Sequence, residues 1–132
     1  MIPITDESKE TLTRLRNLML EQHKLLLDRE RAVYEKEHGP ISGPGQFLTL
    51  VLGDPHFLWL KEISTMVVEI DEAISRRSKA EQPVAEALLE QARRVMRPRE
   101  AGTDFQQRYW AAVQESPDVV ILQCKMEAVL GI

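Results

Sequence analysis

Residues 6–38 form a run of 33 residues that contains neither proline nor glycine. Such a run favours one uninterrupted α-helix, because proline and glycine are the residues that most weaken a helix interior. Gly39 and Pro40 follow at once, and this pair is typical of a helix end. The helix would be roughly 50 Å long, whereas a domain of this size has a radius of gyration of about 14 Å. We therefore expect it to extend beyond its domain, to bend, or to be covered by a second copy of the chain.

Apolar and polar layers alternate along this helix. Apolar triplets at 18–20, 25–27 and 32–34 are spaced seven residues apart. Each triplet covers about 200° of the helix surface, so the helix should pack against neighbours on more than one side. Polar residues that point into the same sector lie between the triplets, and they are Gln22, His23, Arg29 and Glu30. If these groups are buried they need partners, because an unpaired buried polar group costs about 1–3 kcal/mol.

Capping signals and apolar spacing predict the remaining helices. Asp54, Thr103 and Ser116 are expected N-caps, and Gln106 completes a capping box with Thr103. The segment 46–52 is apolar and too short to be a stable helix alone, so we expect it to be buried. The predicted ranges are 46–52, 55–77, 83–96, 104–115 and 117–130, and residues 97–102 are predicted to form a loop.

These patterns predict an all-α, single-domain bundle of five or six helices with a long N-terminal helix. The domain spans residues 1–132, of which 1–5 form an N-terminal tail. No strand pattern or internal repeat is found, and short connections favour antiparallel neighbours. In the last helix four apolar residues are expected on one side, namely Val120, Ile121, Cys124 and Ala128.

Composition narrows the classes of partner. Of the 132 residues 43% are hydrophobic and 29% charged, which is typical of a globular domain rather than a disordered chain. The net charge of −4 disfavours nucleic acid and anionic membrane surfaces. The single cysteine, Cys124, fits a reducing compartment. The N-terminus does not read as a signal peptide, and the longest apolar runs are too short to span a membrane. We expect a cytoplasmic protein with no nucleic-acid or membrane partner.

Several short motifs follow one another in a characteristic order. They are His38-Gly39-Pro40, Asp54-Pro55 with Phe57, Trp59 and Leu60, Ile70-Asp71, Gly102-Thr103, Phe105-Gln106, Arg108-Tyr109 and Asp118-Val119-Val120. Their order resembles a group of small all-helical bacterial proteins of about this length, to which no activity is assigned. The resemblance extends over most of the chain. It implies an all-helical fold and a bacterial source, and it transfers no catalytic residue.

No set of residues predicts a catalytic centre. A carboxylate-bridged di-metal bundle needs two Glu-x-x-His motifs, and the chain has one, Glu35 with His38. His38 also fits a C-terminal cap, because the helix dipole favours its cation. No nucleophile elbow, Ser-x-x-Lys motif or phosphate-binding loop occurs. We expect no catalytic residue, no protein-built metal site and no cofactor.

Three groups of residues are candidates for binding. The first would line an internal pocket for a small molecule or metal, and comprises Gln22, His23, Arg29, Glu30, His56 and Trp59. The second would bind a phosphate group or an acidic partner, or form a solvated helix end that complements the helix dipole. It comprises Arg93, Arg94, Arg97 and Arg99. The third is the adjacent pair Tyr109 and Trp110, which cannot both point into one core, so that one of them would anchor an interface or pack at the rim.

Two functional hypotheses follow. The first is a non-enzymatic helical bundle that acts through self-association, with a dimer as the first expectation, or through a protein partner. It rests on the length and apolar width of the first helix and on the pair Tyr109 and Trp110. The second is a bundle that binds a small molecule or metal through the polar residues of its first helix, and it predicts a cavity beside His23.

Overall fold

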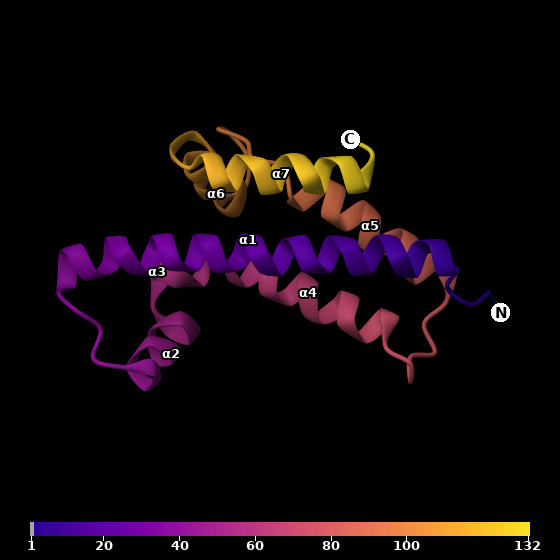
Figure 1. The fold of residues 1–132 in the computed structure, drawn as a ribbon, viewed down its shortest axis with the longest axis horizontal. Coiled ribbons are helices and arrows are strands. Elements are labelled where there is room, and N and C mark those ends of the chain that lie inside the picture. The colour runs from indigo at the N-terminus through magenta and orange to yellow at the C-terminus, as the bar shows by residue number, and fades with distance from the viewer. Residues whose placement is uncertain (1) are drawn as a thin grey trace.

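The computed structural model describes residues 2–132. Within this range the chain folds into seven helices arranged around one long central helix (Figure 1). Their bounds are α1 Asp6–His38, α2 Pro44–Gly53, α3 Pro55–Leu58, α4 Lys61–Ile74, α5 Gln82–Val95, α6 Asp104–Glu115 and α7 Pro117–Leu130. The predicted all-α fold and the predicted bounds of the first helix are confirmed.

Helix α1 forms the middle layer of the molecule. α7 packs on one of its sides and α4 on the other, and α5 contacts both α1 and α4; Figure 1 shows α6 and α7 above α1, α2, α3 and α4 below it, and α5 crossing it obliquely. Its fully buried apolar residues are Leu12, Leu15, Met19 and Leu26. The prediction that α1 packs on more than one side is confirmed, and its middle is covered by helices of the same chain.

The third predicted helix is divided in two by a turn at Trp59 and Leu60, which raises the number of helices described in residues 2–132 to seven. Two hydrogen bonds of the tighter i to i+3 kind form this turn, from Leu60 N to the Phe57 carbonyl and from Ile63 N to the Leu60 carbonyl, both 3.1 Å. The side chains of Trp59 and Leu60 are both buried. α4 then ends at Ile74, three residues before the predicted end.

The predicted caps are present. Asp54, Thr103 and Ser116 each accept a hydrogen bond from a backbone N–H in the first turn of the helix that follows, and both bonds of the capping box between Thr103 and Gln106 form. The predicted N-terminal tail is held against the start of α5, because Gln82 N donates to the Ile2 carbonyl at 2.8 Å.

Helix α2 is not buried, so the prediction of a buried segment at 46–52 is wrong. None of its residues is buried, and Leu48 and Leu52 are 58% and 70% exposed. α2 is held from one face only, where the Phe47 ring lies 4.5 Å from the Arg31 guanidinium and 5.9 Å from the Phe57 ring. The side of α2 that faces away from the protein therefore remains uncovered.

The four apolar residues predicted to share one side of α7 do so, and that side faces solvent. Val120, Ile121, Cys124 and Ala128 are all exposed. α7 packs against the rest of the molecule through the other side, with Val119, Leu122, Met126 and Leu130. Apolar spacing does not distinguish the two sides, because the helix is apolar around most of its circumference.

Candidate functional site

Gln22 belongs to a buried polar network between α1, α6 and α7. Its Nε2 donates to the Tyr109 hydroxyl at 2.7 Å and to the Val119 carbonyl at 2.9 Å. The Tyr109 hydroxyl donates to Oε1 of Gln123, whose Nε2 donates to the Met96 carbonyl at 2.9 Å. Burial raises the pKa of Tyr109 well above its ordinary value, so the hydroxyl stays protonated and available as a donor. The network joins three helices to the start of the loop between α5 and α6.

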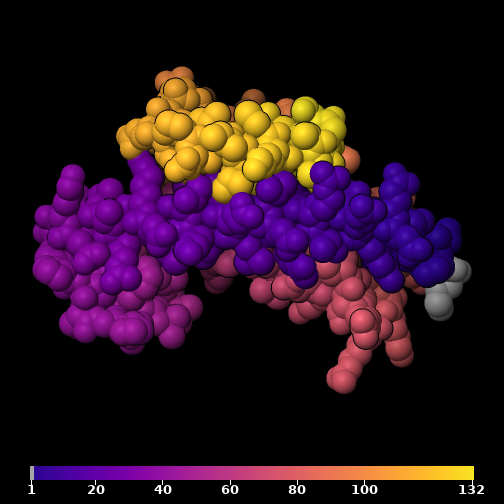
Figure 2. Space-filling model, viewed as in Figure 1, coloured from indigo at the N-terminus to yellow at the C-terminus, as the bar shows by residue number. Residues whose placement is uncertain are grey.

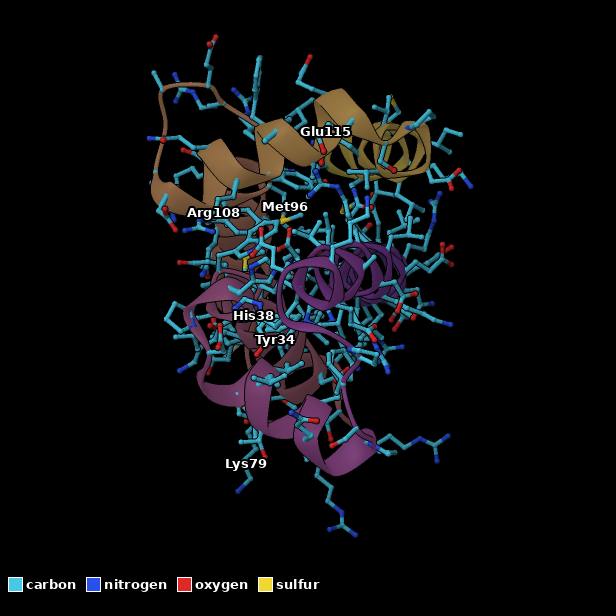
Figure 3. The ribbon with its side chains drawn as sticks, turned by 90° about the vertical axis from the view of Figure 1, so that its left-hand side faces the viewer. Tyr34, His38, Lys79, Met96, Arg108 and Glu115 are labelled. Carbon is cyan, nitrogen blue, oxygen red and sulfur yellow. The ribbon has the colours of Figure 1, made fainter. Side chains whose placement is uncertain are left out.

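Arg29 and Glu30 belong to a second, separate cluster nearer the C-terminal end of α1. The Arg29 guanidinium contacts Glu30 at 3.3 Å and also pairs with Glu115 at the end of α6. The Glu30 carboxylate is buried and lies 2.8 Å from Nε2 of His56 on α3. Figure 3 shows Glu115 on the α6 side of α1, which is viewed there along its axis. The cluster ties α1 to α6 on one side and to α3 on the other.

The six residues predicted to line a pocket are not brought together in one place. Gln22 lies in the first network, whereas Arg29, Glu30 and His56 pair with one another in the second cluster. His23 is half-buried, and burial lowers its pKa. Gln22, Arg29, Glu30 and His56 take protein partners, although Gln22 Oε1 itself is buried without a partner in residues 2–132.

In the core, the Trp59 ring is next to the Phe105 ring of α6, which in turn is next to the Tyr109 ring of the same helix. The Trp59 and Phe105 rings are 5.7 Å apart, and the Phe105 and Tyr109 rings are 5.5 Å apart. Tyr109 is fully buried and therefore belongs to the core rather than to a protein interface. Trp110 is half-buried, so only this member of the predicted interface pair reaches the surface.

The four arginines lie together on one surface cleft, which we call the arginine cleft. It has a volume of about 1280 Å³ and lies between the start of α4, the end of α5 and the start of α6. Trp59 and Phe105 also line it, together with Leu58 and Lys61. Sequence reasoning missed Leu58 and Lys61 as members of this site, because the turn that divides α3 from α4 gives no capping or proline signal. It also missed Phe105, because this residue belongs to another helix, α6, and nothing local to it indicates the contact.

A second surface feature is apolar and lies on the opposite side of α1 from α7. This side of α1 is next to α4 and α2, because Arg16 pairs with Asp71 of α4 at 2.8 Å and because Leu27 and Arg31 line a groove with α2. Leu20 shares this stripe of α1, because residues three, four or seven apart share a helix face.

Val68 lies one turn from Asp71, the α4 residue that pairs with Arg16 of α1, and it is exposed. Leu20 and Val68 are 49% and 54% exposed. Figure 2 shows this side of the molecule hollowed beneath α1, between α2 and the far end of α4. We call Leu20, Val68 and the exposed Leu48 and Leu52 of α2 the apolar underside.

Residues 2–132 contain neither a cluster of side chains suited to a metal ion nor a membrane-spanning helix. No cluster of three or more histidine, cysteine, aspartate or glutamate side chains suited to a metal ion occurs in that range. None of its helices combines the length and apolarity needed to cross a bilayer. No protein-family model, curated protein or solved structure matches the chain.

Proposed function

We propose that this protein is a non-enzymatic helical bundle that acts by association, with a second copy of the same chain as its partner. The observation that carries the proposal is α2, an apolar helix whose outward leucines are uncovered. α2 has ten residues, and an isolated helix of that length is marginal in water. Covering its outer face would therefore stabilise both the helix and the complex.

The composition of α2 suits the centre of an interface. Its sequence, from Pro44 to Gly53, contains no charged residue, and the outward positions include Leu48, Thr49 and Leu52. Charged residues are depleted from the fully buried centre of protein interfaces, and contiguous exposed apolar patches mark interaction sites. A surface helix that only covers a core usually carries charged residues on the face that meets water.

The shape of the apolar underside favours a second copy as the partner. α2 projects from the same face that is hollowed between α2 and α4 (Figure 2). A twofold axis can place the α2 of each chain in the hollow of the other, which is the self-complementary arrangement of a symmetric dimer. Arg16 and Asp71, which share helix stripes with Leu20 and Val68, pair with one another, so this ion pair adds no net charge beside the apolar underside.

The exposed area is consistent with an interface of ordinary size. The chain exposes 8194 Å². A folded monomer of its mass, 15.2 kDa, is expected to expose about 7,100 Å². The excess of roughly 1,100 Å² is comparable to the roughly 800 Å² that each partner buries in a standard interface.

Sedimentation velocity over about 1 to 200 µM protein tests the proposal, because association depends on concentration. We expect a species of twice the chain mass, and we expect Leu52→Lys to shift it to the monomer by placing a charge in the interface. Ile121→Lys is the matched control, since Ile121 on α7 is 53% exposed and lies outside the apolar underside. Far-UV circular dichroism of both variants verifies that they fold.

Two results would overturn the proposal. The first is a monomer of the natural sequence throughout the concentration range. The second is a dimer that survives Leu52→Lys and dissociates with Ile121→Lys, which would assign the contact to α7.

A further inference from the structure

The arginine cleft gathers positive charge in a chain that is acidic as a whole. Five cationic and three acidic residues line the cleft, whereas the whole chain has a net charge of −4. Two of the three carboxylates are already engaged, Glu90 by Arg93 at 3.4 Å and Asp104 by Arg108 at 3.2 Å. The cationic residues are Lys61, Arg93, Arg94, Arg97 and Arg99.

Three of these arginines have guanidinium groups that are free to bind a ligand. Arg94, Arg97 and Arg99 are exposed, and no ion pair joins them to a carboxylate anywhere in residues 2–132. Arg93 differs, because its Nε donates to the Leu130 carbonyl at 2.9 Å and so helps to hold α5 against α7. Guanidinium groups bind carboxylates through paired hydrogen bonds, which makes free arginines suited to an acidic ligand.

The loop that carries Arg97 and Arg99 is held in place by the protein core. Gln106 is buried, its Oε1 accepts from Thr103 N at 3.0 Å, and its Nε2 donates to the Arg94 carbonyl at 3.0 Å. The Gln106 carbonyl accepts from Arg99 N at 3.2 Å. At the start of the loop the buried Gln123 holds the Met96 carbonyl. A loop fixed in this way loses little conformational entropy when a ligand binds.

The cleft also offers an apolar contact beside the charges. Leu58 is exposed at its edge, and the rings of Trp59 and Phe105 form part of its wall. Its volume of about 1280 Å³ exceeds the roughly 300–1,000 Å³ of a small-molecule pocket, and it is open to solvent. An extended peptide fits a surface of this kind better than an enclosed metabolite does.

We propose that the arginine cleft binds an acidic peptide segment of a partner protein. Carboxylates of the peptide pair with Arg94, Arg97 and Arg99, and an apolar side chain of the peptide packs against Leu58 and Trp59. The site is separate from the apolar underside and does not depend on self-association.

Fluorescence polarisation with a labelled peptide of alternating glutamate and leucine tests this proposal on the full chain. We expect a dissociation constant below about 100 µM at about 50 mM salt, with weaker binding as salt rises. Arg97→Glu together with Arg99→Glu should weaken binding at least about tenfold. The matched control is Arg76→Glu with Arg77→Glu, two exposed arginines of the α4–α5 loop, which should change binding by less than about twofold.

Further measurements distinguish peptide binding from the binding of other anions, and loss of binding from loss of folding. Pyrophosphate, used as a competitor, should displace the peptide only at far higher concentration than an unlabelled copy of the peptide. Leu58→Ser should weaken peptide binding but leave pyrophosphate binding unchanged. Arg97→Gln with Arg99→Gln repeats the test without reversing charge, and circular dichroism checks each fold.

Several outcomes would overturn the proposal. The first is that no peptide binding is detected up to about 1 mM. The second is that the double substitutions at Arg97 and Arg99 and at Arg76 and Arg77 weaken peptide binding equally. The third is that pyrophosphate binds as tightly as the peptide. Equal weakening would indicate non-specific attraction, and tight pyrophosphate binding would indicate a site for a free anion.

Discussion

The Tyr109 hydroxyl is the central member of the buried network, and Tyr109→Phe removes it while keeping the ring. The hydroxyl accepts from Gln22 on α1 and donates to Gln123 on α7. If burial of apolar area alone decided stability at this position, phenylalanine would be neutral or stabilising, because it removes a polar atom from the core. The network predicts the opposite sign.

The structure sets the size of the effect. Two hydrogen bonds are lost, each worth about 1 kcal/mol net, and Gln123 Oε1 is left buried without its donor at a cost of about 1–3 kcal/mol. Gln22 Nε2 keeps its bond to the Val119 carbonyl. We therefore expect Tyr109→Phe to lower the free energy of unfolding by about 3–5 kcal/mol. Gln22→Leu should cost less, because it also removes Gln22 Oε1, a buried atom that has no hydrogen-bond partner in residues 2–132.

Urea unfolding followed by circular dichroism measures these differences, at one fixed protein concentration because association adds stability. Tyr34→Phe is the control, since the half-buried Tyr34 hydroxyl makes no hydrogen bond with residues 2–132. It should change the free energy by less than about 0.5 kcal/mol. A Tyr109→Phe variant as stable as the natural protein would refute the reasoning.

The pH dependence provides a second check on the same variant. The pKa of Tyr109 is raised in the folded state from its ordinary value of 10.0. Above pH 10 the unfolded chain releases the proton while the folded chain keeps it, so the natural protein loses stability as the pH rises. Tyr109→Phe has no such loss. The gap between the two proteins should therefore narrow by about 1.4 kcal/mol from pH 9 to pH 11, and a constant gap would contradict the assignment.

Two further predictions concern single residues. Gly102→Ala should lower the free energy of unfolding in urea by about 1–3 kcal/mol and weaken peptide binding to the arginine cleft, because an added Cβ would lie 2.3 Å from Gln106 Oε1 and break its hydrogen bonds. Gly53→Ala is the control and should change neither quantity, because its added Cβ would meet nothing within 4 Å. His23→Gln should reduce the loss of stability between pH 7 and pH 5, because the folded-state pKa of His23 lies below 6.5 and the unfolded chain therefore takes up the proton first as the pH falls. An equal loss in the natural protein and the variant would show that His23 does not contribute.

Local signals predicted most of the helices because each rests on a few neighbouring residues. Thr103 and Gln106 specify the start of α6, and the absence of proline and glycine from 6–38 specifies α1. The face that each helix buries was less predictable. α7 is apolar on both sides, so which side meets α1 depends on the position of the partner helices, which its own residues do not encode.

The candidate sites also differ in how far the sequence predicted them, according to whether their residues are close together in the chain. The arginines were found from the sequence because four of them lie within seven residues. The polar residues of α1 were expected to share a pocket because they share a helix sector. Gln22 and Glu30 instead meet different helices, since α7 covers one part of α1 and α3 another. Partners contributed from distant positions, such as Gln123 for Tyr109, carry no local signal at all.

The turn at Trp59 and Leu60 links the two proposed surfaces. The turn is formed by hydrogen bonds of the tighter i to i+3 kind, and it buries the side chains of both residues. The chain changes direction, and α2 with α3 is thereby set apart from α4. On one side this separation leaves the hollow of the apolar underside. On the other it leaves Leu58 and Lys61 at the edge of the arginine cleft. Core packing at two adjacent residues thus determines the shape of both surfaces through which we propose that the protein binds its partners.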